Sequence, residues 1–458
     1  MLIEISRELT IAEAPDFFEH AVMARLTFEN PQFAEAVEQG RWTGNINPLV
    51  ECWYRDEAGR LVVPRGFARQ LCVMARKAGI PFDLVDRRRT LPDVDFAFAG
   101  KLRPFQDGAV EAILRHDFGT LAAPTGSGKT VMALAVIAAR RQPALIVCHT
   151  RELAIQWVDR IGAFLGIEPD DVGMIGAGKK RIGAKVTVAL VQSLYRCAED
   201  VAQHVGFILT DECHRTPSRT FTEAVGAFDS RFMLGLSATP WRRDRLSRLI
   251  FWYLGDVVHE VDRAALVEQG HLVPVEIVQR PTCFETLKDA SEHYQAVLSE
   301  LTQDPKRNQQ IADDVACEAA RGSGICLVLS DRKAHAETLR GMLRDRGIRA
   351  AALHGGLPAK ERARVVDSLQ AGKIRVLVAT GQLIGEGFDL PALSALFLAT
   401  PIRFSGRVLQ YLGRVLRPAQ GKERATVVDF IDKSVPVLRA SAAARGRVYN
   451  RFSAGGLQ

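Results

Sequence analysis

The sequence predicts an α/β protein in which two domains, each a parallel sheet flanked by helices, follow a small α+β module. From Leu102 to about Val261, short apolar runs alternate with segments of helical periodicity, the pattern of strands joined by helical crossovers. The same alternation restarts after Gly270. Before about Asp95, the chain instead mixes glycine and aromatic residues with short alternating runs, so this part stands apart.

Length and composition agree with this division. A chain of 458 residues is too long for one core, and the predicted boundaries are 1–95 for the module, 96–265 for the first domain and 266–458 for the second. With 47% hydrophobic and 25% charged residues, the composition is that of a soluble globular protein. The net charge of +7 permits a polyanionic partner but does not require one.

The eight cysteines include no pair at C-x-x-C spacing and no Cys/His cluster with the spacing of a metal site. Several lie within apolar runs, as reduced core cysteines do, so we expect a cytoplasmic protein without structural zinc. The first residues carry several acids and no apolar signal core. The longest apolar stretch, Val131 to Ala139, is far too short to span a membrane.

The module begins the chain. Its candidate strand runs are Gly40 to Ile46, Leu49 to Tyr54 and Arg60 to Phe67, and Asp56-Glu57-Ala58-Gly59 predicts a hairpin turn between the last two. Phe67 to Gly79 has the periodicity of an amphipathic helix. Arg87-Arg88-Arg89, followed by Pro92, indicates a connector to the next domain.

Both domains that follow are expected to have mainly parallel sheets. In the first, helices begin near Lys129, Arg151 and Phe221, and the candidate strands are Thr120–Ala123, Ala144–His149, Val186–Val191, Phe207–Thr210 and Phe232–Leu236. In the second, the candidate strands are Val273–Val278, Gly324–Leu329, Arg349–Leu353, Ile374–Ala379, Ala395–Leu398 and Ala425–Phe430. Its helices are expected at Arg332–Arg346, Ala359–Ala371, Phe404–Leu416 and Val435 to about Val448.

The segment from Ala123 to Thr130 has the context of a phosphate-binding loop: an apolar strand, a glycine-rich turn and the start of a helix. Gly126 and Gly128 allow the backbone from Thr125 through Ser127 to point several N–H groups at one anion. Lys129 is placed to reach the β- and γ-phosphates of a nucleotide, and Thr130 to hold Mg²⁺. The alternative is an ordinary glycine-rich turn at the start of a helix.

A second candidate site follows the apolar run Phe207–Thr210, because a doubly wound sheet keeps its ligand at the carboxyl ends of its strands. Here Asp211 is expected to hold Mg²⁺, and Glu212 to orient and deprotonate an attacking water. The alternative is a solvated acidic pair that caps the next helix. That alternative loses weight because a phosphate loop lies upstream.

A third candidate site is the segment Gln410 to Pro418. On a helix, Gln410, Arg414 and Arg417 share one face, and two arginines on one face suit the charge that develops on a triphosphate during hydrolysis. The alternative is a basic helix face exposed to water.

Together these segments resemble superfamily 2 helicases and translocases, from about Leu102 to Asp432. The resemblance implies two tandem RecA-like domains, with Leu102 to Gln106 as the adenine-reading Q motif and Asp211-Glu212-Cys213-His214 as a DECH box. It assigns nucleotide contacts to Arg103, Gln106 and Asp389, and arginine fingers to Arg414 and Arg417. It assigns coupling between nucleotide and strand to Ser237 and Thr239, and nucleic-acid contacts to Thr150, Arg151, Gln192, Ser193, His354, Gly355 and Thr380.

The module resembles, more loosely, the amino-terminal part of the UvsW/XPB-like group, through Asn30–Phe33, Gly40–Gly44 and Val63–Gly66. Where XPB-like proteins carry an Arg-Glu-Asp triplet, this chain has Arg242-Arg243-Asp244, which favours the phage-like members. Arg41, Arg60 and Arg65 are candidates to meet duplex phosphates. Trp42, Trp53 and Tyr54 are candidates to stack on bases, with half-buried packing as the alternative. For Lys179-Lys180-Arg181, a phosphate-tracking loop and a solvated loop are equally expected.

The resemblance implies an ATP-dependent helicase or translocase that uses ATP and Mg²⁺ and acts on single-stranded, duplex or forked DNA, alone or with protein partners in a repair or defence complex. An RNA helicase, a motor subunit of a restriction complex and an ATP-gated clamp with little turnover are the alternatives. A clamp would lack Glu212 or the arginine pair, and this sequence contains both.

Overall fold

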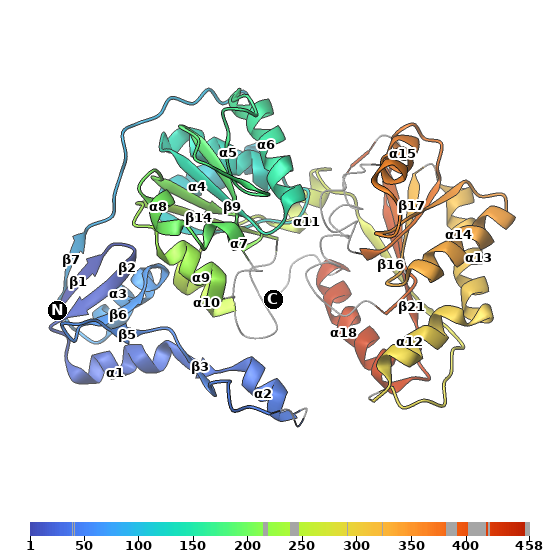
Figure 1. Cartoon of the computed structure of the whole chain (residues 1–458), viewed down its shortest axis with the longest axis horizontal. Helices are drawn as coiled ribbons and strands as arrows, with labels where there is room; N and C mark the ends of the chain where they lie inside the picture. Colours follow the sequence, from blue (N-terminus) through green and yellow to red (C-terminus); the bar gives the residue numbers. More distant parts are fainter. Residues whose placement is uncertain are drawn as a thin grey trace. The chain divides into compact units, whose positions relative to one another are not determined.

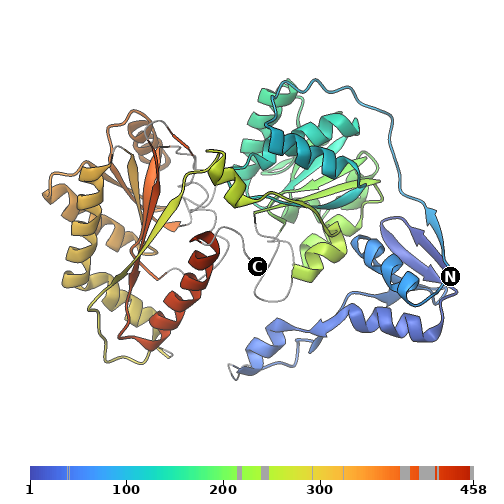
Figure 2. The same ribbon diagram turned by 180° about the vertical axis from the view of Figure 1, so that it is seen from behind.

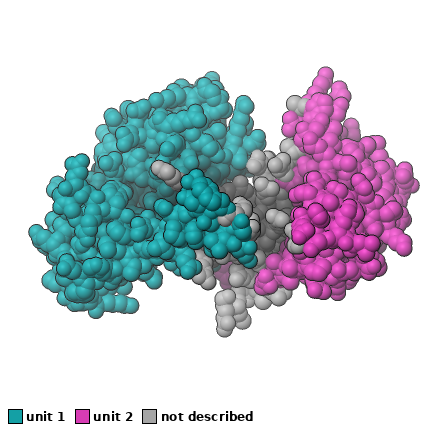
Figure 3. Space-filling view, turned by 60° about the horizontal axis from the view of Figure 1, so that its bottom comes forward, with its two compact units in different colours: residues 1–123, 128–261 teal, residues 124–127, 262–458 magenta. Residues whose placement is uncertain are grey.

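The computed structural model describes residues 1–38, 40, 42–213, 219–238, 247–290, 292–322, 324–381, 392–401, 418–419 and 422–453. They form two compact units, one of residues 1–123 and 128–261 and the other of residues 124–127 and 262–458 (Figure 3). The module and the first RecA-like domain therefore belong to one unit. In each domain, parallel strands are flanked by helices, which confirms the predicted fold class (Figures 1 and 2).

The module is built on a five-stranded sheet of order β5-β6-β2-β1-β7, in which β1 and β7 are parallel and the other pairs antiparallel. Asp56 to Gly59 form the predicted hairpin turn between β5 and β6, with Gly59 at a left-handed φ of 76°. The strands of the sheet are β1 (Leu2–Ile5), β2 (Glu8–Ala12), β5 (Tyr54–Arg55), β6 (Leu61–Pro64) and β7 (Asp83–Asp86). The helices of this part are α1 (Asp16–Arg25), the 3-10 helix η1 (Arg65–Phe67) and α3 (Ala68–Lys77).

An arm leaves this sheet and carries β3 (Thr27–Glu29), α2 (Pro31–Glu38) and β4 (Leu49–Glu51) (Figure 1). Its base is fixed because the Trp53 indole Nε1 donates to Thr27 Oγ1 at 2.9 Å, which identifies Trp53 as a packing residue. The expected strand run from Gly40 to Ile46 is wrong, because its described residues form turns and irregular backbone. Trp42 in that stretch is 76% exposed.

The first domain has an eight-stranded sheet of order β11-β10-β12-β9-β13-β14-β8-β15, parallel except for the β10–β11 hairpin. Its strands are β8 (Phe118–Ala122), β9 (Ala144–Cys148), β10 (Gly173–Gly176), β11 (Lys179–Arg181), β12 (Val186–Leu190), β13 (Phe207–Thr210), β14 (Phe232–Ser237) and β15 (Val257–Glu260). All five predicted strands are present. Strand β10 and the two edge strands, β11 and β15, are additions.

Helices cover both faces of this sheet. Helices α4 to α6 lie on one face, and α9 and α10 lie on the other (Figures 1 and 2). Apolar side chains of α7 to α10 form a core with alternate residues of the central strands, including Leu145, Val147 and Ile208. The helices are α4 (Pro104–Leu114), α5 (Lys129–Arg140), α6 (Arg151–Leu165), α7 (Val191–Leu194), α8 (Ala198–Ala202), α9 (Arg219–Gly226) and α10 (Ser247–Leu254). The next helix, α11 (Arg263–Glu268), belongs to the second unit.

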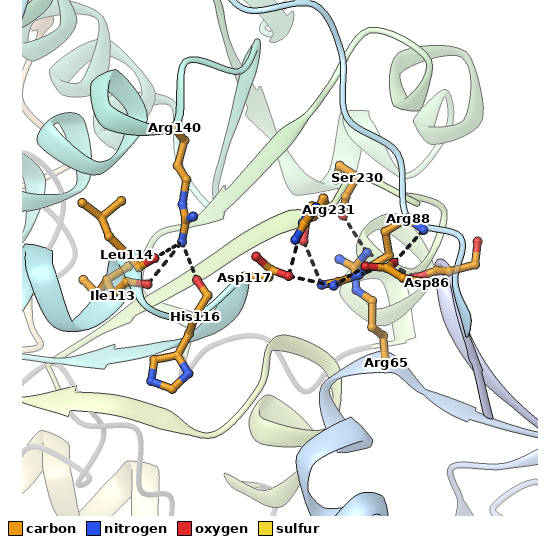
Figure 4. Close-up of polar contacts among 11 residues, drawn as sticks. Arg65, Asp86, Arg88, Ile113, Leu114, His116, Asp117, Arg140, Ser230 and Arg231 are labelled. Carbon is orange, nitrogen blue, oxygen red and sulfur yellow. Dashed lines mark hydrogen bonds and ion pairs between the residues drawn. The ribbon is translucent and has the colours of Figure 1, made fainter. Parts of the chain in front are cut away.

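The module is held against the first domain by a buried arginine. Arg65 is 3% exposed, and its guanidinium donates to the carbonyl oxygens of Ser230 at 2.8 Å and Phe228 at 3.3 Å (Figure 4). Burial lowers the pKa of Arg65 to about 10. The expectation that Arg65 meets duplex phosphates is therefore wrong, because the side chain is buried and one of its terminal nitrogens donates to the protein's own backbone.

The predicted connector is also anchored. Arg88 donates to Asp86 and, at 2.7 Å, to Asp117, the residue before β8, and Arg231 joins the same carboxylate (Figure 4). Arg89 pairs with Asp229 at 2.7 Å. These contacts tie the end of the module to the amino end of the strand that leads into the phosphate loop.

The second unit has a six-stranded, wholly parallel sheet of order β16-β21-β20-β17-β19-β18. All six predicted strands are present, as β16 (Val275–Pro281), β17 (Ile325–Leu329), β18 (Ala350–Leu353), β19 (Val376–Ala379), β20 (Leu393–Leu398) and β21 (Ala425–Ile431). The helices are α12 (Tyr294–Gln303), α13 (Pro305–Arg321), α14 (Lys333–Asp345), α15 (Ala359–Gln370) and α18 (Pro436–Ser453). The helix expected at Phe404–Leu416 lies outside the described residues.

Two buried ion pairs stabilise this unit. Arg307 of α13 and Asp432, whose side chains are 0% and 1% exposed, are 2.8 Å apart, and Arg445 of α18 meets Asp429 at 2.8 Å. All eight cysteines lie in the described part of the chain, and none is in a disulfide. Within that part, no helix is both long and apolar enough to cross a membrane.

Candidate nucleotide site

The candidate nucleotide-site residues of the first domain gather at the carboxyl edge of its sheet. Strands β13, β14 and β8 are neighbours, and they end at Thr210, Ser237 and Ala122. Ala123 N–H donates to the Ser237 carbonyl oxygen at 2.9 Å, so the start of the phosphate loop is joined to the residue predicted to couple nucleotide and strand. The strand order therefore places Ser237 between the loop and Asp211.

The loop after β8 has the backbone that an anion cradle requires. Gly126 and Gly128 have left-handed φ values of 92° and 86°, and α5 begins immediately afterwards at Lys129. The buried Ser127 hydroxyl donates to the Pro124 carbonyl oxygen at 2.7 Å and closes the turn. The N–H groups of the first turn of α5 and the positive end of its dipole are thereby presented at one place.

Two side chains of the loop fit a phosphate ligand. Lys129 Nζ donates to the Ala123 carbonyl oxygen at 3.0 Å, which holds the ammonium group beside the loop. The Thr125 hydroxyl oxygen is buried and has no hydrogen-bond partner among the described residues. A buried hydroxyl normally has a partner, and an anion in the loop would supply one.

Gln106 lies against this loop. Its Oε1 accepts from Arg103 N–H at 2.9 Å, so the two predicted residues form the first turn of α4. A Cβ placed on Gly128 would collide with Gln106 Nε2, so the glycine is required both for its φ and for the approach of this side chain. The Q-motif amide and the phosphate loop are therefore in direct contact.

Asp211 is 8% exposed, and both of its carboxylate oxygens are held. Oδ2 accepts from the indole Nε1 of Trp157 at 2.8 Å, and Oδ1 accepts from Glu212 N–H at 2.9 Å. Burial, with the nearby Glu212 charge, raises the pKa of Asp211 to about 6. Glu212 itself has a left-handed φ of 49°, a conformation that is uncommon for a residue with a side chain and is concentrated at functional sites.

The residues present fit a magnesium ion. The Asp211 carboxylate and the Thr130 hydroxyl are hard oxygen donors, and Asp211 keeps acceptor capacity beyond its two hydrogen bonds. No group of three or more His, Cys, Asp or Glu side chains suited to a metal occurs in the described part of the chain. Two protein oxygen ligands, from Asp211 and Thr130, suit Mg²⁺, which usually keeps waters and binds phosphate oxygens.

Sequence analysis missed Trp157 as a site residue. Its indole is 2% exposed and lies on the buried side of α6, a position typical of a core aromatic. The feature that could have indicated a site role for Trp157 is its indole N–H group, because a buried donor needs an acceptor.

The predicted nucleic-acid residues of the first domain occupy helix starts. Thr150 caps α6, with its hydroxyl accepting from Leu153 N–H at 3.3 Å, and Arg151 beside it is exposed. Gln192 is exposed and Ser193 half-buried in the short helix α7. The structure leaves Arg151 and Gln192 accessible, while Thr150 has a structural role that does not depend on a ligand.

In the second unit, the predicted residues follow the adjacent strands β18 and β19. His354 Nδ1 accepts from Gly356 N–H at 3.2 Å, and its Nε2 faces Glu337 Oε1 at 3.0 Å. Gly355 is exposed, and Thr380 N–H donates to the Leu353 carbonyl oxygen at 3.1 Å. His354, Gly355 and Thr380 therefore lie at one edge of this sheet. Other predicted residues lie outside the described part of the chain: His214, Thr239, Asp389, Gln410, Arg414 and Arg417.

Two family models match the chain: "Type III restriction enzyme, res subunit" over residues 99–242 and "Helicase conserved C-terminal domain" over residues 309–419. A fragment of a putative HsdR subunit of a type I restriction enzyme from Vibrio vulnificus has a similar fold. It has a TM-score of 0.58 at 19% identity, with 78% of this chain and 67% of that chain covered. At this identity the likeness concerns the fold.

Among curated relatives, a probable helicase of Escherichia phage T5 is 27% identical over 375 residues, which is 81% of this chain and 80% of the relative. A putative DNA 3'-5' helicase, Rad25, of Haloarcula marismortui is 28% identical over 70% of this chain. The chain spans 51% of that relative. The two domain matches and these relatives show that the chain belongs to superfamily 2 of the helicases.

Proposed function

We propose that the protein is an ATP-dependent DNA helicase or translocase that acts on duplex or branched DNA, in unwinding, branch migration or strand annealing. The observation that carries this proposal is the arrangement at the edge of the first sheet, where the loop with Lys129 and the strand with Asp211 flank Ser237. Relatives named as helicases support the nucleic-acid part.

In this proposal, the backbone from Thr125 to Gly128 binds the phosphates of ATP, and Lys129 moves from the Ala123 carbonyl oxygen to the β- and γ-phosphates. Thr130 and Asp211 hold Mg²⁺, which when bound neutralises charge on the phosphate oxygens. Glu212 orients the attacking water and accepts its proton. Arg414 and Arg417, with Gln410, stabilise the charge of the transition state, and Gln106 and Asp389 contact the nucleotide.

The same proposal assigns nucleic-acid contacts to Arg151, Gln192, His354 and their neighbours, with residues 96–265 and 266–458 as the two motor domains. Duplex or junction binding by the module, residues 1–95, stays a prediction. Residues 1–95 contain 15 Asp and Glu and 12 Lys and Arg, so a phosphate contact there depends on a local cluster of arginines.

The first test is an ATPase assay with single-stranded DNA, duplex DNA, forks and RNA side by side. Lys129→Ala is expected to abolish turnover, and Glu212→Gln to bind ATP without hydrolysing it. Arg414→Ala and Arg417→Ala are expected to reduce turnover by about 10³–10⁵ while changing ATP affinity far less. Near-normal turnover of Glu212→Gln would falsify the assignment of the water-orienting residue.

A second candidate function is a motor subunit of a restriction or defence complex, favoured by the match of residues 99–242 to the restriction-enzyme model. Stimulation by long unbranched duplex, with no preference for forks, would support this candidate over the first. An RNA helicase is the outcome if RNA stimulates turnover more than any DNA.

A further inference from the structure

The proposed function gives Trp157 no role, yet its indole contacts the carboxylate assigned to Mg²⁺. We propose that Trp157 is a positioning residue for ATP hydrolysis, which fixes the Asp211 carboxylate in the orientation that receives the magnesium–nucleotide complex. This inference rests on the proposed function, because it assigns a role to one more residue of the same site.

The geometry supports orientation rather than packing alone. Rotation of an Asp carboxylate about its Cβ–Cγ bond is broad, so one hydrogen bond does not define the direction of both oxygens. Here the donors come from two different elements: Trp157 from α6 to Oδ2, and the backbone of Glu212 to Oδ1. Held on both sides, the carboxylate plane is fixed, and its remaining lone pairs have fixed directions.

Burial makes the indole hydrogen bond more effective. Trp157 is 2% and Asp211 8% exposed, so the N–H group does not exchange its partner for water. A hydrogen bond to a charged group is worth about 1.5–3 kcal/mol, more than one between neutral groups. The acceptor of this buried N–H group is the acid of the DECH box.

The decisive variant is Trp157→Phe, which keeps an aromatic ring and removes the donor. Its matched control is Trp53→Phe, which also removes an indole hydrogen bond, to Thr27 in the module. We expect Trp157→Phe to lower kcat by about 10- to 100-fold, the range given by one charged hydrogen bond, and to raise KM for ATP because the magnesium–nucleotide complex is bound less tightly. Trp53→Phe is expected to retain the wild-type kcat.

Binding of a fluorescent ADP, with Mg²⁺ and with EDTA, gives a readout that does not depend on turnover. Trp157→Phe is expected to lose the increase in affinity that Mg²⁺ gives the wild type, while its metal-free affinity is unchanged. Wild-type turnover and wild-type magnesium dependence in a folded Trp157→Phe would overturn the inference and leave the proposed function intact. A wild-type chain without ATPase activity would overturn both.

A measurement on the intact side chain covers the case in which Trp157→Phe does not fold. In protein labelled with 5-fluorotryptophan, the five tryptophans give separate ¹⁹F signals. Asp211→Asn changes the acceptor of one indole, so the signal that it moves most identifies Trp157. We expect the same signal to move when Mg²⁺ is added to the ADP-bound wild type. If Mg²⁺ leaves that signal unchanged, the indole does not sense the metal site and the inference fails.

Discussion

Gly66 of the module packs directly against the backbone of the first domain, and Gly66→Ala tests how far that contact holds them together. A Cβ at this position would lie 2.5 Å from Phe251 O, 2.5 Å from Gly255 N and 2.6 Å from Trp252 O. All three are backbone atoms at the end of α10, so none moves aside as a side chain does. Gly66 has no left-handed φ, and alanine therefore tests the contact alone.

The magnitude follows from these distances. Overpacking a well-packed site costs about 1–3 kcal/mol, and three rigid neighbours place Gly66→Ala at the upper end, about 3 kcal/mol. For a unit of this size, each kcal/mol lowers the melting temperature by about 2–4 °C, so a decrease of about 6–12 °C is expected. The matched control is Gly341→Ala in α14, where nothing lies within 4 Å of the new methyl group. Loss of a helical glycine stabilises by up to about 1 kcal/mol there.

Differential scanning calorimetry measures the transition of the first unit, and limited proteolysis shows which part loosens. Residues 91–103 form neither helix nor strand and join the module to the first domain. We expect Gly66→Ala to be cleaved there sooner than wild type, because the module then separates more often. Melting and cleavage equal to those of wild type would refute the view that Gly66, with Arg65, anchors the module.

Three further predictions concern helix capping and the second unit. Thr150→Ala removes the cap of α6 and is expected to lower stability by about 1 kcal/mol in urea unfolding, whereas Thr150→Ser should retain it; equal losses would contradict the capping role. Arg307→Ala leaves Asp432 buried without its cation, so the free energy of unfolding should decrease by about 3–5 kcal/mol. A decrease below about 1 kcal/mol would show that the Asp432 carboxylate becomes hydrated in the variant. His335 hydrogen-bonds Asn308 and Ser330, and burial lowers its pKa to about 3. Because only the unfolded chain then binds a proton below about pH 6.5, stability should fall by up to about 1.4 kcal/mol per pH unit as the pH decreases from 6.5 towards 3, and His335→Gln should lack this component.

The sequence predicted both parallel sheets because their central strands are continuous apolar runs. Phe207–Thr210 and Ile325–Leu329 are buried along their whole length, and local composition alone identifies such strands. A strand at the edge of a sheet need not be a continuous apolar run. Lys179–Arg181 is exposed at every residue and pairs only with β10, so nothing in its composition indicates a strand.

Contacts between distant parts of the chain were beyond sequence analysis. Arg65 bonds to Ser230, 165 positions later, and Trp157 bonds to Asp211, 54 positions later. Sequence periodicity does not predict such pairs, because it reflects only the helix or strand in which each residue lies. The motif residues Lys129, Asp211 and Glu212 were recognised because their chemistry restricts residue type at each position, whereas Arg65 and Trp157 look like an exposed cation and a core aromatic until their partners are known.

The position of β8 has a consequence for synthesis of the chain. The strand that leads into the phosphate loop lies between β14 and β15, and it pairs with Met233 to Ser237 on one side and Val257 to Glu260 on the other. A ribosome that has just completed the loop must add about 130 residues before both neighbours exist, which takes roughly 7 to 26 s at bacterial to eukaryotic speeds. Both edges of β8 are open until Ser237 has been added and one edge until Glu260 has been added, and the nascent chain cannot hold a nucleotide in its finished form. Premature release before residue 260 should therefore leave a fragment that aggregates through this strand rather than a weak ATPase.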